Sequence, residues 1–222
     1  ANSGAARLRS GPTTTLVNNV RLRHLAMALS SLEPHPMQRS DLEQYATEGN
    51  LAAEWLAAMA AFGDLEGREI IDVGAGNGIL GLGAVMLGAT SVRLIEADPS
   101  VAEVAERNAA DHKANVTVVV EAVQSVDDLA PVHGAVLISN PPWGVQTTGA
   151  DRPILEAMFT SEAEVIHLMH HAEASHVEAL AAGHGWQSED VLRAPFRLPL
   201  VHAHQRSGRR DTEVLCRRFT RA

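Results

Sequence analysis

The chain has 222 residues and a net charge of −9, and 45% of its residues are hydrophobic, so it can bury one full globular core. No apolar run reaches the roughly 18 residues of a membrane span, and no charged start leads into an apolar stretch, so neither a membrane nor a secreted protein is expected. Its one cysteine, Cys216, cannot form an internal disulfide, which fits a reducing cytoplasm.

The charge is distributed unevenly along the chain. Residues 1–40 carry five Arg and one Glu, and residues 193–222 carry eight Arg and two acidic residues. Residues 41–192 hold five basic and 24 acidic residues, so an acidic body lies between two basic ends. Basic ends favour contact with a polyanion, although solvated arginines give the same pattern. Lys113 is the single lysine, a bias that suits a salt-rich cytoplasm, as in a haloarchaeon, or follows from genomic base composition.

The N-terminal part is expected to precede the main fold. Residues 1–18 are small and polar without apolar periodicity, so we expect disorder there, or an artefact of the assigned start. Helical spacing of apolar residues over 20–32 predicts a helix, which "EPHP" ends. A loop follows, and the Ala-rich stretch 51–62 predicts a core helix. Residues 19–50 are therefore a helix and loop at the start of a single domain, 19–222.

From residue 69 onward, predicted strands and helices alternate. The expected strands are 69–73, 91–97, 116–122, 134–140 and 164–170, and the expected helices are 77–88 (ended by Gly88), 98–112 (begun by Asp98 and Pro99), 154–159 and 174–185 (ended by Gly183). This alternation is typical of a parallel sheet with helices on both faces. Two extended runs, 191–200 and 211–219, predict an antiparallel C-terminal hairpin. The expected fold is Rossmann-like α/β, with seven mostly parallel strands.

A glycine-rich loop joins the first strand to its helix. The segment "IIDVGAGNGILG" carries Gly74, Gly76 and Gly78 at alternate positions after Asp72. Glycines allow a sharp turn and close approach of the backbone to a ligand. Glu96 ends the next strand about 20 residues later, where a carboxylate can bind ribose hydroxyls. Loop and acid together predict a nucleoside site in preference to a turn without a ligand.

The fourth strand ends in Asn140-Pro141-Pro142-Trp143. This sequence resembles the [DNS]-P-P-[YFW] motif of methyltransferases that act on planar amino groups, and the D-x-G-x-G-x-G loop resembles that of class I S-adenosylmethionine-dependent enzymes. The Asn140 side-chain oxygen and the Pro141 carbonyl can accept the two N–H bonds of an exocyclic amine and orient its lone pair. The prolines fix the carbonyl direction, and Trp143 can stack on the ring. A rigid turn of purely structural use is the alternative.

The resemblance extends to one family along most of the chain. "VRLRHLAMAL", "LEQYATEGNLAAEWL", "IIDVGAGNGILGLGAVMLGA", "NPPWG" and "HQRSGRRDTEV" occur in the order found in the methyltransferase-like 5 family. These enzymes are N6-adenosine methyltransferases of small-subunit ribosomal RNA, so the resemblance implies that activity in an archaeal-type homologue. It also implies an N-terminal loop that folds over S-adenosylmethionine. The cofactor-binding residues expected are Gln44, Thr47, Asp72, Gly74, Gly76, Asn77, Gly78, Ile79, Glu96, Ala122 and Asn140.

Three positions depart from the family pattern. Ala46 stands where the family commonly has Pro, and Trp143 where it commonly has Phe. The family's acidic residue near the adenine falls at Ala122, and alternation along the strand is expected to point the neighbouring Glu121 to the other face. The adenine amine would then depend on water or on backbone groups at 122–123.

The resemblance also implies partners. The family is supported by a small zinc-binding activator subunit that adds a strand to a sheet edge, so a heterodimer is expected, with the strand 91–97 as the candidate for pairing. Arg206, Arg209 and Arg210 lie around a turn signal, so we expect them at a hairpin tip that binds RNA phosphates, with His204 beside it.

No metal site is expected, because the histidines crowded between residues 167 and 176 lack the spacing of known zinc motifs. Two other functions stay open. A glutamine-N5 methyltransferase acting on a release factor also works on a planar amide, but "LEQYAT" and the basic tail favour RNA. A non-catalytic domain that binds RNA or a partner is the other, and only Ala122 favours it.

Overall fold

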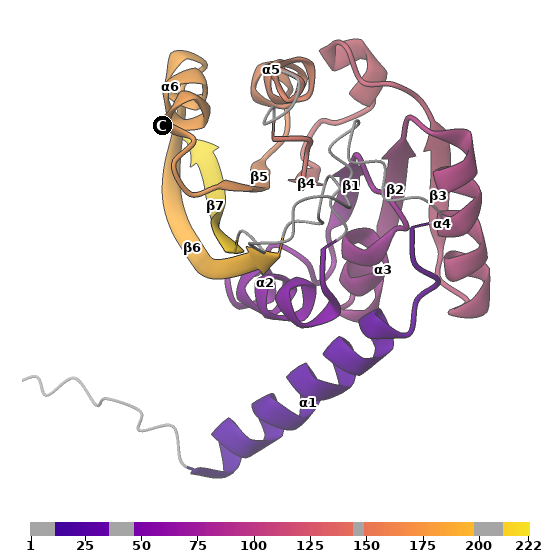
Figure 1. The fold of residues 1–222 in the computed structure, drawn as a ribbon. Helices are drawn as coiled ribbons and strands as arrows, with labels where there is room; N and C mark the ends of the chain where they lie inside the picture. The colour runs from indigo at the N-terminus through magenta and orange to yellow at the C-terminus, as the bar shows by residue number, and fades with distance from the viewer. Residues whose placement is uncertain (1–11, 36–46, 144–148, 198–210) are drawn as a thin grey trace, which may run out of the picture.

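The computed structural model describes residues 12–35, 47–143, 149–197 and 211–222. Seven strands form one sheet in the order β3-β2-β1-β4-β5-β7-β6 (Figure 1). The strands are β1 (Glu69–Val73), β2 (Ser91–Glu96), β3 (Val116–Val120), β4 (Val136–Ser139), β5 (Val165–His171), β6 (Trp186–Arg197) and β7 (Asp211–Arg221). β1 to β5 pair in parallel, whereas β7 is antiparallel to β5 and β6. The predicted sheet is therefore confirmed.

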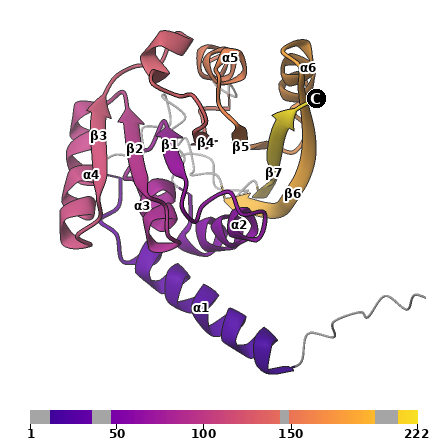
Figure 2. The ribbon, with the colours of Figure 1, turned by 180° about the vertical axis from the view of Figure 1, so that it is seen from behind.

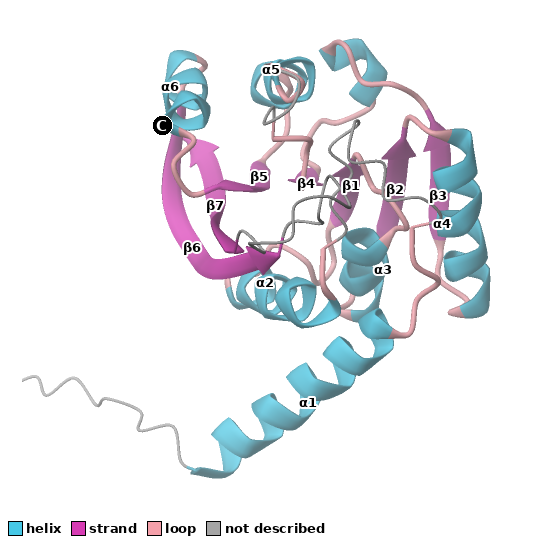
Figure 3. Cartoon of the chain, viewed as in Figure 1, coloured by secondary structure: helices cyan, strands magenta, loops and turns pink. Residues whose placement is uncertain are grey.

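Helices cover both faces of this sheet (Figure 3). They are α1 (Pro12–Ser30), α2 (Gly49–Ala61), α3 (Ile79–Met86), α4 (Pro99–Asp111), α5 (Arg152–Thr160), α6 (Ser175–Gly183) and a short 3₁₀ helix, η2 (Val126–Leu129). Successive residues of a strand point to opposite faces. Ile70 therefore joins a core with α1 to α4, and Ile71 joins a second core with η2, α5 and α6. None of the helices in the described ranges is long and apolar enough to cross a membrane.

Helix α1 begins earlier than the sequence predicted. It starts at Pro12 rather than at residue 20, so the expectation of disorder is wrong for residues 12–18. A proline suits the first helical position, where its missing N–H would have no partner within the helix. The helix extends away from the body, and its C-terminal end packs into the core through Leu25 and Leu29 (Figures 1 and 2).

Glycines in the left-handed conformation follow α2, α3 and α6, at Gly63, Gly88 and Gly185. Gly88, with a φ of 94°, follows α3 as predicted. Helix α6 ends at Gly183 as predicted, and the left-handed position after it is taken by Gly185, with a φ of 77°. The turn needs its glycine one residue beyond the C-cap, and His184 occupies the C-cap itself.

Strand β2 lies inside the sheet. It pairs with β1 on one side and with β3 on the other. The segment 91–97 therefore has no free edge, and the prediction that it pairs with a partner's strand is wrong. Among the strands that the structure describes, the sheet edges are β3 and β6.

The order of the strands places three loops together. The chain adds β2 and β3 on one side of β1 and then returns to add β4 on the other side. Val73 is paired with both Ile95 of β2 and Ser139 of β4, so these three strands end at the same level. In open α/β sheets, ligands bind at such a reversal of strand order, outside the carboxyl ends of the strands.

Candidate functional site

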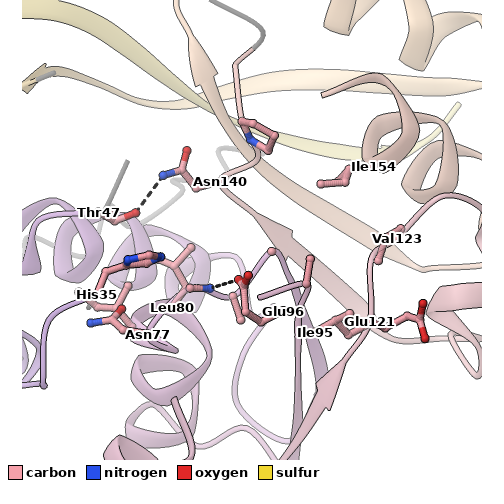
Figure 4. Close-up of a pocket in the computed structure, with 16 residues that line it drawn as sticks. His35, Thr47, Asn77, Leu80, Ile95, Glu96, Glu121, Val123, Asn140 and Ile154 are labelled. Atoms are coloured by element: carbon pink, nitrogen blue, oxygen red, sulfur yellow. Dashed lines mark hydrogen bonds between the residues drawn. The ribbon is translucent and has the colours of Figure 1, made fainter. Parts of the chain in front are cut away.

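A pocket of about 280 Å³ opens at the carboxyl ends of β1, β2 and β4 (Figure 4). The predicted site residues that line it are Thr47, Gly74, Gly76, Asn77, Ile79, Glu96, Asn140 and Pro142. The predicted residues that lie outside its wall are Asp72, Gly78, Ala122, Pro141 and Trp143. The predicted residues that fall outside the described part of the chain are Gln44, His204, Arg206, Arg209 and Arg210, and their roles stay predictions.

The loop after β1 presents its backbone to the pocket. Gly74 and Gly76 have φ angles of 72° and 57°, in the left-handed region that other residues rarely adopt. A Cβ added to either would meet no atom within 4 Å, so it would occupy open space. The glycines thus leave the room that a ligand needs to reach the main chain.

Glu96 is held rigidly at the end of β2. Its Oε2 accepts a hydrogen bond from the Gly76 nitrogen at 2.9 Å, and its Oε1 accepts one from the Asp98 nitrogen at 3.0 Å. The side chain is buried, yet it lines the pocket beside the glycine loop (Figure 4). A carboxylate oxygen can accept more than one hydrogen bond. Glu96 can therefore bind two vicinal hydroxyls while its own position stays fixed.

Asp72 supports the glycine loop from behind. It is 1% exposed, and its Oδ2 accepts a hydrogen bond from the Gly81 nitrogen of α3 at 2.8 Å. Burial raises the pKa of this carboxyl to about 7. Asp72 was expected to bind the cofactor, but the structure places it where it holds α3 against β1 without reaching the pocket.

The Asn140 side chain is oriented by two neighbours. Its Nδ2 donates to Thr47 Oγ1 at 3.1 Å, and its Oδ1 accepts from the indole Nε1 of Trp143, also at 3.1 Å. Thr47 comes from the segment before α2, so residues 93 positions apart meet at the pocket (Figure 4). The predicted meeting of Thr47 and Asn140 at one site agrees with this arrangement.

Trp143 does not offer the stacking surface that the sequence suggested. It is only 5% exposed, and its ring meets the Phe196 ring edge-on, with centroids 4.9 Å apart. A buried indole requires a partner for its N–H, and Asn140 supplies that partner. The expectation that Trp143 stacks on a substrate ring is therefore wrong, and its contacts make it a support for Asn140.

The wall beyond β3 also differs from the expectation. Glu121 and Val123 line the pocket, whereas Ala122 does not. β3 ends at Val120, so the alternation of faces along the strand no longer governs residue 121. An acidic residue thus lies in the wall after all, although its carboxylate is directed away from Glu96 in Figure 4.

His35 lines the pocket and was missed by the sequence analysis. It lies two residues after Glu33. The backbone carbonyl of Glu33 accepts hydrogen bonds from Asn77 Nδ2 at 3.0 Å and from Asn108 Nδ2 at 3.1 Å. Arg107 adds a two-bond ion pair to the Glu33 carboxylate at 2.8 and 2.9 Å. These contacts tie the segment after α1 to the glycine loop and α4. The local sequence "EPHP" signals only a helix end, because the anchoring residues lie more than 40 positions away.

Comparison with a protein family covers most of the pocket region, all but His35 and Thr47. Residues 52–170 match the model of the methyltransferase small domain. This range is more than half of the chain and contains the glycine loop, Glu96 and Asn140.

Individual relatives match over longer ranges. An uncharacterized protein of Methanocaldococcus jannaschii is 32% identical over 192 residues, which cover 82% of this chain and 86% of that protein. METTL5 of Danio rerio, an rRNA N(6)-adenosine-methyltransferase, is 23% identical over 205 residues, which cover 90% of this chain and 99% of that protein. A solved structure of a candidate RNA methyltransferase from Pyrococcus horikoshii has a TM-score of 0.79 and 31% identity, and covers 91% and 99% of the two chains.

Proposed function

The chain belongs to the methyltransferase small domain family, and we propose that it transfers a methyl group from S-adenosylmethionine to N6 of an adenosine in small-subunit ribosomal RNA. The observation that carries this proposal is the oriented amide of Asn140 in the pocket that also holds Glu96. The similarity to an rRNA N6-adenosine methyltransferase along almost the full length of both chains supports the choice of substrate.

S-adenosylmethionine is the cofactor expected for this family, and the pocket residues fit it. Glu96 is placed to accept hydrogen bonds from the ribose hydroxyls, and Gly76 leaves the loop open for close approach. Ile95, Val123 and Ile154 provide apolar surface for a purine ring. When bound, the cofactor supplies a methyl group activated by a positively charged sulfur.

The chain's own contribution to the reaction is positioning. An exocyclic amine is a poor nucleophile because its lone pair is delocalised into the ring. A carbonyl oxygen can accept two hydrogen bonds, so Asn140 Oδ1 can hold an amine hydrogen together with the Trp143 N–H. The Pro141 carbonyl is the expected second acceptor. Fixing the amine in this way directs its lone pair, and no general base of unusual pKa is required.

Labelled S-adenosylmethionine tests the proposal directly. The protein is incubated in parallel with small ribosomal subunits, large subunits and release factor, and the products are digested and identified by mass spectrometry. N6-methyladenosine confined to small-subunit RNA supports the proposal. Methylglutamine in the release factor would establish the alternative enzyme, and no transfer to any acceptor would favour the non-catalytic domain.

Partners and location belong to the same proposal. Of the strands that the structure describes, β3 and β6 are the edges that a strand of a zinc-binding activator subunit could join, because β2 is paired on both sides. Arg206, Arg209 and Arg210 remain the proposed contacts to RNA phosphates. The single cysteine suits action in a reducing cytoplasm, and an archaeal-type source belongs to the proposed family resemblance.

A further inference from the structure

A buried set of side chains lies behind Asn140. Trp143 donates its indole N–H to Asn140, and the Trp143 ring lies against the ring of His170, with centroids 6.3 Å apart and planes tilted by 36°. His170 Nε2 is 3.1 Å from Asp151 Oδ2. Asp151, at 3% exposed, and His170, at 1%, are withdrawn from solvent. The amide that is proposed to hold the substrate amine is thus connected to a buried carboxylate through two rings.

The protonation of His170 follows from its two contacts. The His171 backbone N–H donates to His170 Nδ1 at 2.9 Å, so Nδ1 is an acceptor. In a neutral ring the proton then resides on Nε2, which donates it to Asp151. Burial lowers the pKa of His170 although Asp151 acts to raise it, so the neutral ring is favoured. Both ring nitrogens are fixed, and the ring plane that Trp143 meets is fixed with them.

Hydrogen bonding explains this cluster better than a metal ion does. Asp151, His170 and His176 lie close enough together to hold a metal ion. A neutral imidazole whose Nδ1 accepts a backbone N–H carries its proton on Nε2, and a protonated nitrogen cannot ligate. The 2.6 Å between His176 Nε2 and Asp151 Oδ2 is also a hydrogen-bond distance.

The Asp151 carboxylate contacts His170 and His176 instead of capping the N-terminus of α5. Asp151 immediately precedes α5, where aspartate normally accepts a bond from the first turn, yet its side chain makes no such bond. Burial raises the pKa of this carboxyl, but hydrogen bonds from His170 and His176 outweigh burial and lower it. An ionised Asp151 is therefore held by β5 and α6 rather than by its own helix.

We propose that His170 and Asp151 are positioning residues for methyl transfer. They fix the Trp143 indole, and Trp143 fixes the Asn140 oxygen. The inference rests on the proposed function, in which Asn140 receives the substrate amine. The chain offers a matched control in Asp64 and His167, a second buried aspartate–histidine pair whose histidine also lies on β5 and whose contact is 2.7 Å. Asp64 also binds Arg218, and neither member of this pair lines the pocket.

Steady-state kinetics separate positioning from stability. Trp143→Phe keeps an aromatic ring but removes the N–H, and Asp151→Asn removes the charge with little change in volume. Both are expected to lower kcat about tenfold or more, the scale of one lost oriented hydrogen bond, with the KM for S-adenosylmethionine changed less than about twofold. Asp64→Asn is expected to lower the melting temperature and leave kcat unchanged. Equal kcat losses in Asp151→Asn and Asp64→Asn, or a wild-type kcat in Trp143→Phe, would overturn the proposal.

A second measurement does not depend on transfer. The chain has three tryptophans, so ¹⁵N-tryptophan labelling gives three indole N–H signals, and the one that Trp143→Phe removes is Trp143. Asp151→Asn should speed hydrogen exchange of that signal, and Asp64→Asn should not. Unchanged exchange in Asp151→Asn would refute the positioning role even if the wild type methylates no RNA. If Asp151→Asn does not fold, His170→Gln serves in both measurements, because glutamine can still donate to Asp151 but cannot pack as a ring against Trp143.

Discussion

The Gly76 nitrogen lies 2.9 Å from Glu96 Oε2, so one hydrogen bond joins the loop after β1 to the end of β2. Both halves of the proposed cofactor site depend on that bond. The acid orders the loop, and the loop in turn orients the acid toward a ribose.

Glu96→Gln is expected to weaken S-adenosylmethionine binding about 10- to 100-fold, because a hydrogen bond to a charged group contributes about 1.5–3 kcal/mol. Isothermal titration calorimetry measures the change. Glu106→Gln, an exposed change on α4, is the matched control and should bind like the wild type. Equal affinities for all three proteins would mean that the ribose is held elsewhere.

Asn140→Ala is expected to reduce methyl transfer about 10²–10³-fold, the cost of one oriented hydrogen-bonding group at a reaction centre. Cofactor affinity should change only a few-fold, because Glu96 and the glycine loop are untouched. Single-turnover transfer and calorimetry on the same preparation provide the two values. Turnover within a few-fold of wild type would exclude Asn140 from the reaction.

Asp72 predicts a pH dependence of stability. Its pKa is raised to about 7 in the folded protein, above the ordinary value of 3.8. The stabilisation from its protonated form is complete below about pH 4 and is lost as pH rises through about 7. Asp72→Asn carries no such proton, so the free energy of unfolding of the wild type should fall relative to this variant across that range. Urea unfolding of both proteins at several pH values tests this, and parallel curves would contradict it.

Asn108→Ala is expected to weaken cofactor binding from a distance. The Asn108 side chain is buried and joins the Glu33 backbone to the Asn77 carbonyl, with contacts of 2.7 to 3.1 Å. Its loss leaves backbone groups unpaired at a cost of about 1–3 kcal/mol and releases the segment that carries His35. Arg107→Ala removes only a solvent-screened ion pair to the same Glu33, so it should weaken binding less. If the two variants bind the cofactor equally, the anchoring of this segment does not matter for binding.

The sequence predicted the parts of the site that depend on local pattern. Apolar runs fixed the strands, and glycine spacing with an acid after the next strand identified Gly74, Gly76 and Glu96. These features depend on residues close in the chain, so periodicity and turn chemistry are sufficient to find them.

Features that depend on distant contacts could not be predicted in this way. Burial of Trp143 requires Phe196, which lies on β6, and the placement of His35 requires Asn108 on α4. Glu121 lies in the pocket wall rather than on the other face, because β3 ends one residue before it. Strand ends are poorly marked in sequence. The first residues of α1 show no apolar stripe at helical spacing, so periodicity could not reveal that the helix begins at Pro12.

The pocket lies across the boundary between the two cores that the sheet separates. Ala75 and Leu80 in its wall belong to the core of α1 to α4, whereas Val123 and Ile154 belong with η2 and α5. A ligand in this pocket therefore contacts residues of both cores, so unfolding of either core removes part of its binding site. Bound cofactor at about 100 times its Kd should raise the free energy of unfolding by about 2.7 kcal/mol, and this gain should appear in one cooperative transition shared by both layers.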